Sequence, residues 1–189
     1  PQRIPFQNLC ANLFINRLDN VFAYNNAVGN SEDTVSISEL DFHRSQNVGR
    51  FSIDEMVKKN FAQDNNLKVP NYELDTANSS AVKVLRLDTL ELFENIEFIK
   101  VDIEGMELEF FKGAMQTISE NSFPPIFYER IPDVWFQDRA DILDKYLIGL
   151  GYYLTPIGSD VIAQHKTRPQ YLRCNVDDNK ISFEMTKVK

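Results

Sequence analysis

Two carboxylates stand two positions apart at the end of the segment that most strongly predicts a buried strand. Asp102 lies in the segment EFIKVDI at 97–103, Glu104 directly follows it, and Gly105 comes next. Residues at i and i+2 of a strand point to the same side, so both carboxylates are expected to face one site. There they can hold a divalent metal, orient a hydroxyl group or act as a general base. The alternative is that one of them caps the following helix.

Three further residues invite a chemical interpretation. Glu129 ends the segment PIFYE at 125–129, where it can face a substrate or form a local ion pair with Arg130. His43 can act as a base near neutral pH, or it can be a solvated loop side chain. His165 is expected at the surface.

Several other kinds of site find no support in the sequence. The seven glycines stand at positions 29, 49, 105, 113, 149, 151 and 158, and neither a dinucleotide fingerprint nor a P-loop can be written through them. No Ser-His-Asp or Cys-His arrangement can be recognised, and no CxxC or Cys/His cluster suggests zinc. Cys10 is expected to be a small buried side chain, and two cysteines without a motif indicate a reducing compartment.

The composition is that of an ordinary globular chain. It has 189 residues, of which 43% are hydrophobic and 25% charged, and a formal net charge of −8. The acidic balance argues against nucleic-acid binding and against an anionic membrane surface as a partner. The chain contains no run of about 18 apolar residues that would span a membrane. We therefore expect a cytoplasmic protein that binds neither nucleic acid nor membrane.

The spacing of apolar residues predicts alternating helices and strands. Helices are expected at about 4–17, 108–118 and 140–150, and strands at 21–28, 34–38, 82–87, 97–103, 125–129, 152–157 and 161–164. Glu107 and Glu109 are expected to complement the dipole of the second helix. The order predicts an α/β fold with a mainly parallel sheet and a closing antiparallel hairpin. In such sheets ligands lie beyond the carboxyl ends of the strands.

Residues 40–80 form a polar excursion rich in Asn, Gln, Ser and Asp. The residues SIDE at 52–55 have the pattern of a capping box that begins with Ser52, and Met56, Val57 and Phe61 would share one face of the helix that follows. We expect one short helix here, within a lid or a substrate wall.

The order and spacing of several motifs together resemble the FkbM-type methyltransferases. LDNV at 18–21, NAVG at 26–29 and LDTL at 87–90 match the pattern of that family. The most specific match is FIKVDIEG at 98–105, followed by Glu107 and by KGA at 112–114, and PIFYE at 125–129 also fits. The resemblance covers about residues 1–165.

The resemblance implies one Rossmann-like domain over residues 1–189 that uses S-adenosylmethionine as its cofactor. The expected reaction is methylation of a hydroxyl oxygen of a sugar or secondary metabolite, so the partner is a small-molecule or glycan acceptor. Asn26, Ala27 and Val28 are then expected beside the adenine of the cofactor. Asp102 and Glu104 are expected at the methyl-transfer site, as the catalytic pair.

His43 and Glu129, singled out above from their residue types and positions, are candidate residues for binding the acceptor. The resemblance assigns no metal ligand. A carboxylate-rich, metal-dependent hydrolase built on Asp102, Glu104 and Glu129 is a weaker alternative.

The chain also departs from the family pattern. The family carries, before the first helix, a strand with a DxGxxxG-like loop and a second strand that ends in an acid followed by proline. Neither is in this chain, and Pro1 resembles the proline after that acid, so we expect the first strands of the sheet to be absent. Three explanations are open: the natural protein is longer, this is a truncated gene product, or a homo-oligomeric partner covers the resulting open edges. The main alternative function is therefore a non-catalytic methyltransferase-like fragment or binding domain without cofactor.

Overall fold

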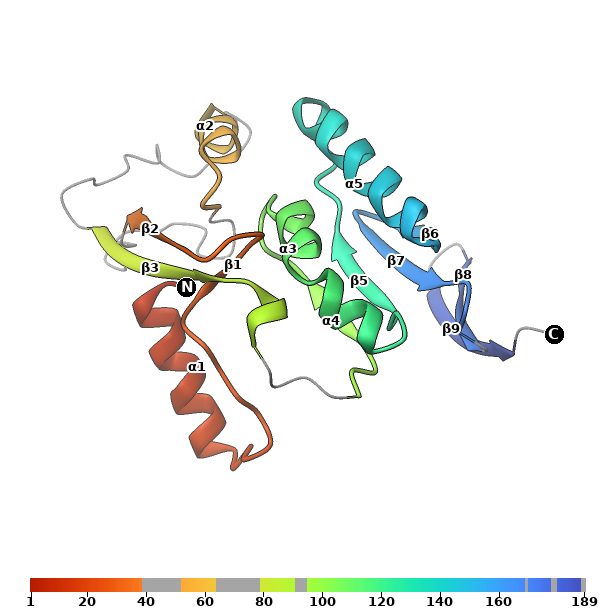
Figure 1. The fold of residues 1–189 in the computed structure, drawn as a ribbon, viewed down its shortest axis with the longest axis horizontal. Helices are drawn as coiled ribbons and strands as arrows, with labels where there is room; N and C mark the ends of the chain where they lie inside the picture. The colour runs from red at the N-terminus through yellow and green to blue at the C-terminus, as the bar shows by residue number, and fades with distance from the viewer. Residues whose placement is uncertain (39–51, 64–78, 91–94, 169, 178–179, 188–189) are drawn as a thin grey trace.

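The computed structural model describes the chain except for residues 39–51, 64–78, 91–94, 169, 178–179 and 188–189 (Figure 1). The α-helices are α1 (Arg3–Ile15), α2 (Glu55–Gln63), α3 (Glu107–Gly113), α4 (Met115–Glu120) and α5 (Gln137–Leu150). Two short 3₁₀ turns are η1 (Leu87–Thr89) and η2 (Val134–Phe136). The strands are β1 (Ala27–Val28), β2 (Asp33–Ser38), β3 (Ser79–Leu85), β4 (Ile99–Val101), β5 (Ile126–Glu129), β6 (Tyr152–Ile157), β7 (Asp160–His165), β8 (Gln170–Asp177) and β9 (Lys180–Lys187).

The described strands form three sheets with the orders β1-β3-β2, β4-β5-β7-β6 and β8-β9. The pairs β1/β3 and β4/β5 are parallel, and the other pairs are antiparallel. The prediction of a mostly parallel sheet is therefore wrong for these strands, which form mixed sheets. The reason is that β2 pairs antiparallel with β3, although β3 follows it only after the polar excursion, while β7 returns beside β5 from the hairpin. The predicted antiparallel hairpin is confirmed as β6/β7, in register from Tyr152 opposite His165 to Ile157 opposite Asp160.

Helices α3 and α4 lie between the three-stranded and four-stranded sheets, and α5 runs beside the four-stranded sheet (Figure 1). The largest apolar cluster joins these three helices to that sheet. Phe111, Tyr128 and Leu147 are fully buried in it. The rings of Phe111 and Tyr128 meet edge to face with centroids 6.0 Å apart, a favoured aromatic geometry. This packing fixes the start of α3 relative to the ends of β4 and β5.

A backbone contact joins α3 to the three-stranded sheet. A Cβ atom on Gly113 would overlap the carbonyl oxygen of Gly29, the residue after β1. The Gly29 N–H in turn donates to the carbonyl of Leu85 at the end of β3. The glycine in the KGA motif is therefore needed because the helix lies directly on the chain that leaves β1.

The LDTL motif has a structural role that the sequence analysis did not assign. Asp88, in η1, accepts the N–H of Thr117 at 2.8 Å and that of Gln116 at 3.2 Å. These are N–H groups of the first turn of α4, which have no partner inside the helix. A residue 29 positions before Thr117 therefore caps α4.

The first helix was predicted correctly in position but not in burial. None of the residues of α1 is buried, and Phe14 and Ile15 are 85% and 73% exposed. Cys10 is an exposed free thiol, so its prediction as a buried side chain is wrong. The apolar spacing predicted the helix correctly, but on that face Phe6 and Leu13 are only half-buried and Leu9 and Cys10 are exposed.

Three other predicted elements are shorter or divided. The strands expected at 21–28 and 97–103 are reduced to Ala27–Val28 and Ile99–Val101, and the helix expected at 108–118 is split at Ala114 into α3 and α4. In the part of the chain that the structure describes, no helix combines the length and the apolar character needed to cross a membrane.

Candidate active site

Three carboxylates meet where β4 and β5 end. One carboxylate oxygen each from Asp102, Glu104 and Glu129 lies within 4.8 Å of the others. The two strands are parallel neighbours with Val101 opposite Tyr128, so the residues that follow them are brought to the same edge. Asp102 is exposed, while the other two side chains are half-buried. We call these three residues the acid cluster.

A turn, rather than the alternation of a strand, brings Asp102 and Glu104 together. Strand β4 ends at Val101, and the chain turns through two successive left-handed residues, Glu104 with φ 55° and Gly105 with φ 97°. A Cβ atom on Gly105 would also lie 2.8 Å from Cγ2 of Val57. Glycine is therefore required at 105 for both its backbone conformation and the space it leaves.

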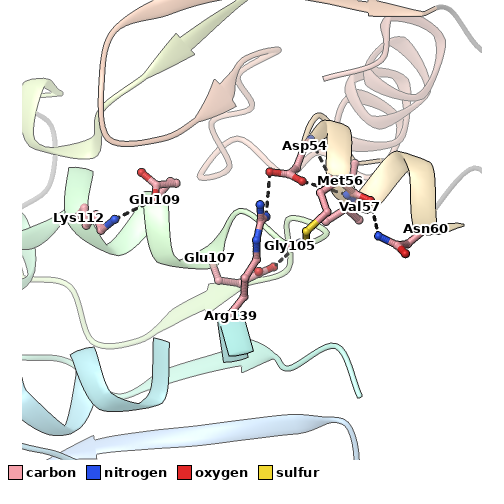
Figure 2. A network of polar contacts seen from close by, with 10 residues as sticks. Asp54, Met56, Val57, Asn60, Gly105, Glu107, Glu109, Lys112 and Arg139 are labelled. Atoms are coloured by element: carbon pink, nitrogen blue, oxygen red, sulfur yellow. Dashed lines mark hydrogen bonds and ion pairs between the residues drawn. The ribbon is translucent and has the colours of Figure 1, made fainter. Parts of the chain in front are cut away.

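Neither Asp102 nor Glu104 is the N-cap residue of α3. The N-cap residue of α3 is Met106, and it makes no side-chain cap hydrogen bond. Glu107 instead accepts hydrogen bonds from the turn that follows β4. It is 1% exposed, and its Oε1 accepts the N–H of Ile103 at 3.3 Å. The same oxygen accepts the N–H of Gly105 at 3.2 Å (Figure 2). Burial raises the pKa of Glu107, although N–H groups of Glu107, Gly105 and Ile103 oppose that shift.

Glu109 lies in the first turn of α3, as predicted for an acid that complements the helix dipole. It pairs with Lys112 at 2.9 Å on the outside of α3 (Figure 2). The two acids at the start of this helix therefore have different roles, although they stand only two residues apart.

Basic residues around the acid cluster are themselves held in place. Lys100 donates to Asp102 at 2.6 Å, and this hydrogen bond is the main reason that the pKa of Lys100 is raised, with Asp160 and Glu129 contributing. Arg130 reaches the other way, to Asp141 at 3.1 Å and Asp144 at 3.2 Å on α5. Arg130 thus forms its ion pairs with α5. Lys100 neutralises part of the negative charge of the acid cluster.

Part of the polar excursion packs beside the turn. Asp54 caps α2 by accepting the N–H of Val57 at 3.0 Å, and it accepts a second bond from Arg139 of α5 at 2.9 Å (Figure 2). Ser52, the predicted cap, instead accepts the N–H of Asp54 at 3.1 Å. Although partial burial opposes it, the bonds from Val57 and Arg139 hold the pKa of Asp54 below its usual value.

Helix α2 therefore adjoins the turn that carries Glu104. Val57 is fully buried and packs with Ile131, Phe136 and Ala140. The short helix was predicted, but its cap is two residues later than the capping box suggested. The role of the excursion as a lid stays a prediction.

The residues predicted to bind adenine lie in the other sheet. Ala27 and Val28 form β1, and the side-chain amide of Asn26 donates to the carbonyl of Lys83 at 3.4 Å. Beside them, Oδ1 of Asn25 is buried without a hydrogen-bond partner among the described residues. His43 falls outside the described residues.

His165 was predicted at the surface, and that prediction is wrong. It is 5% exposed and stacks on Phe123 with ring centroids 4.1 Å apart. Its Nε2 lies 2.8 Å from the carbonyl of Leu150, so this nitrogen carries the proton and donates. His165 thereby ties the end of α5 to β7. The sequence does not reveal this burial, because it depends on the pairing of His165 with Tyr152 in the β6/β7 hairpin.

The family assignment rests on a comparison with protein-family models. The model of the methyltransferase FkbM domain matches residues 3–154, from the start of α1 into β6. No curated protein and no solved structure matches the chain significantly. The matched region contains the acid cluster, Glu107, both close-packed glycines and the Asp88 cap. The chain belongs to the FkbM methyltransferase domain family.

Proposed function

We propose that the protein transfers a methyl group from S-adenosylmethionine to a hydroxyl oxygen of a small molecule or glycan, such as a sugar or secondary metabolite. The observation that carries the proposal is the acid cluster at the ends of two parallel strands in an FkbM-family domain. Ligands of α/β sheets typically lie beyond these strand ends. The Rossmann-like character of the complete domain is part of the same proposal.

The residues present suit this cofactor in two places. The acid cluster offers three carboxylates to a ligand that carries a positively charged sulfur and an ammonium group. The buried Oδ1 of Asn25, which adjoins Asn26, Ala27 and Val28, is an acceptor that the amino group of an adenine could satisfy. A glycine-rich cofactor loop cannot be written from the glycines of this chain, so cofactor binding is the first property to measure.

The main task of the protein in this reaction is to align the acceptor oxygen with the methyl group. When bound, S-adenosylmethionine supplies a methyl group on a sulfonium whose thioether is a good leaving group. The protein then has to hold the acceptor oxygen in line with that methyl group. A carboxylate of the acid cluster would accept the hydroxyl proton as the new carbon–oxygen bond forms.

Of the two predicted catalytic carboxylates, Glu104 fits the role of base better. Asp102 is exposed and already bonded to Lys100 at 2.6 Å, so its charge is partly neutralised. Glu104 is less exposed, and its turn is fixed by Gly105 and Glu107. Asp102 and Glu129 would then orient the acceptor, with His43 as a further proposed contact.

The test is methyl transfer to a panel of hydroxyl acceptors, measured by mass spectrometry with the wild type and with Asp102→Asn/Glu104→Gln. Loss of a general base typically lowers the rate by about 10²–10⁴-fold. We expect the double variant to fall in this range and Glu104→Gln alone to cost more than Asp102→Asn. Full methyl transfer by the double variant would refute the assignment of the acid cluster.

The alternative is a methyltransferase-like domain that binds a partner or substrate without cofactor. The lack of a glycine-rich loop among the 189 residues favours it. It predicts that neither S-adenosylmethionine nor S-adenosylhomocysteine produces heat on titration. Repeating the titration with Mg²⁺ and Mn²⁺ tests whether the acid cluster holds a divalent cation, which three carboxylate oxygens within 4.8 Å permit.

We also propose a cytoplasmic location and a homo-oligomeric state. A free, exposed thiol such as that of Cys10 suits a reducing compartment. Strands β1 and β4 stand at the edges of their sheets as the described strands pair, and a second copy can cover such edges. Sedimentation of the purified protein tests the oligomeric state.

A further inference from the structure

Glu107 is a buried acid at the start of α3 that the reaction itself does not use. It is 1% exposed, whereas glutamate is almost never fully buried unless it is paired. Burial raises the pKa of its carboxyl. Burying this carboxyl therefore costs folding free energy. The hydrogen bonds that it accepts indicate what its burial achieves.

The two hydrogen bonds of Glu107 come from the residues immediately before and after Glu104. The same oxygen, Oε1, accepts the N–H of Ile103 at 3.3 Å and the N–H of Gly105 at 3.2 Å. The residue between them is Glu104, which has a φ of 55°. A left-handed conformation is unfavourable for a residue with a side chain, and it persists only where its surroundings hold it.

The opposite side of the turn is packed closely. A Cβ atom on Gly105 would lie 2.8 Å from Val57 and 3.3 Å from Phe136. Glu107 holds the peptides through hydrogen bonds, while α2 and the adjoining core leave the turn little room to move (Figure 2). The direction of the Glu104 side chain follows from these two constraints.

We propose that Glu107 is a positioning residue, which clamps the peptides of Ile103 and Gly105 so that the carboxylate of Glu104 stays in the acid cluster. This inference rests on the proposed function and adds to it a residue outside the acid cluster. Glu107 contacts neither acceptor nor cofactor and acts through Glu104. What the clamp needs from residue 107 is a hydrogen-bond acceptor at Oε1, which an amide oxygen also supplies.

The experiment compares Glu107→Gln, which keeps an acceptor, with Glu107→Leu, which keeps the approximate size without one. Glu109→Gln and Glu109→Leu are matched controls in the same helical turn, where the half-buried Glu109 pairs with Lys112 at 2.9 Å. For each variant, kcat and KM for the acceptor, Kd for S-adenosylmethionine, thermal stability and amide exchange at residues 103–105 are measured.

We expect Glu107→Gln to keep kcat within about threefold of the wild type, because the acceptor oxygen remains. Glu107→Leu should lower kcat on the order of 10²-fold, the typical cost of a 1 Å misplacement, with Kd for S-adenosylmethionine little changed. Amide exchange at Ile103 and Gly105 should accelerate in Glu107→Leu alone. Both Glu109 variants should match the wild type.

Three results would overturn the proposal. They are equal kcat values for the Gln and Leu variants, unprotected Ile103 and Gly105 amides in the wild type, and a fall in kcat that parallels thermal stability across all variants. The wild-type exchange measurement remains decisive if Glu107→Leu does not fold. A wild type that neither binds S-adenosylmethionine nor transfers methyl would reject the proposed function, while the exchange comparison still decides whether Glu107 holds the turn.

Discussion

Acidic residues in this chain perform jobs that residue type alone does not reveal. Asp88 caps α4 through N–H groups that follow it by 28 and 29 positions. Asp54 caps α2 and also bonds Arg139, and Glu107 is buried beside a turn. The sequence singled out Asp102 and Glu104 correctly as neighbours, because the end of an apolar strand is a local feature. For Glu107 the sequence predicted only interaction with the helix dipole. Its burial could not be predicted, because burial depends on which other elements pack over a residue and not on the spacing of residues in the sequence.

The buried carboxyl of Glu107 should make stability depend on pH. Its folded-state pKa is raised, so the folded protein holds this proton more tightly than the unfolded chain. The stability that this gives is fully present below the ordinary pKa of 4.5 and is lost as pH rises through the raised value. Glu107→Gln cannot titrate, so its stability relative to the wild type should increase as pH rises.

Urea unfolding of both proteins at a series of pH values above 4 measures this difference. Glu109→Gln is the control, and its difference from the wild type should stay flat or nearly so. A pH-independent gap between Glu107→Gln and the wild type would show that the Glu107 carboxyl does not titrate differently in the folded state.

The Asp88 cap should be worth a measurable part of the folding free energy. Asp88→Ala removes the acceptors of two N–H groups of α4 and should cost about 1–2 kcal/mol. Asp88→Asn keeps one oxygen and should cost less. The measurement is the free energy of unfolding, with Asp138→Ala in the exposed first turn of α5 as the control, expected to change it by a few tenths of a kcal/mol. Equal effects of Asp88→Ala and Asp138→Ala would contradict the capping role.

At the scale of elements, positions were predicted better than contacts. Periodicity placed α1, α5 and the β6/β7 hairpin, because each is long enough to show its repeat. It missed the break at Ala114 and the shortness of β1, which depend on how α3 and β1 meet. The cap of α2 moved from Ser52 to Asp54, because the ion pair with Arg139 holds Asp54 there.

The contact between α3 and β1 gives a sharp test at this scale. Gly113→Ala should cost about 1–3 kcal/mol or more, because its methyl group would overlap the Gly29 carbonyl. Gly149→Ala in α5 meets nothing within 4 Å and should stabilise by up to about 0.5–1 kcal/mol. Thermal unfolding of both variants decides the matter. Midpoints that move in the same direction would show that α3 does not lie against the chain at Gly29.

At the scale of the whole molecule, the family could be predicted from the sequence, but the pairing of the strands could not. The motifs between residues 18 and 129 suffice for the family, and the family model matches residues 3–154. The mixed sheets were not foreseen, because alternation of helices and strands favours parallel pairing and does not say where a strand returns beside its neighbour. The acid cluster arose across two strands, and only their parallel register brings Glu129 to Asp102.

The most direct measurement is calorimetric titration of the protein with S-adenosylmethionine, repeated with S-adenosylhomocysteine. The proposed methyl transfer requires binding of S-adenosylmethionine. We expect both compounds to bind, with Kd values between about 1 μM and 1 mM, the usual range of KM for enzyme substrates. Asp102→Asn/Glu104→Gln should weaken the binding of the cationic S-adenosylmethionine more than that of the neutral-sulfur product. Binding of neither compound at millimolar concentration would contradict methyl transfer by this chain.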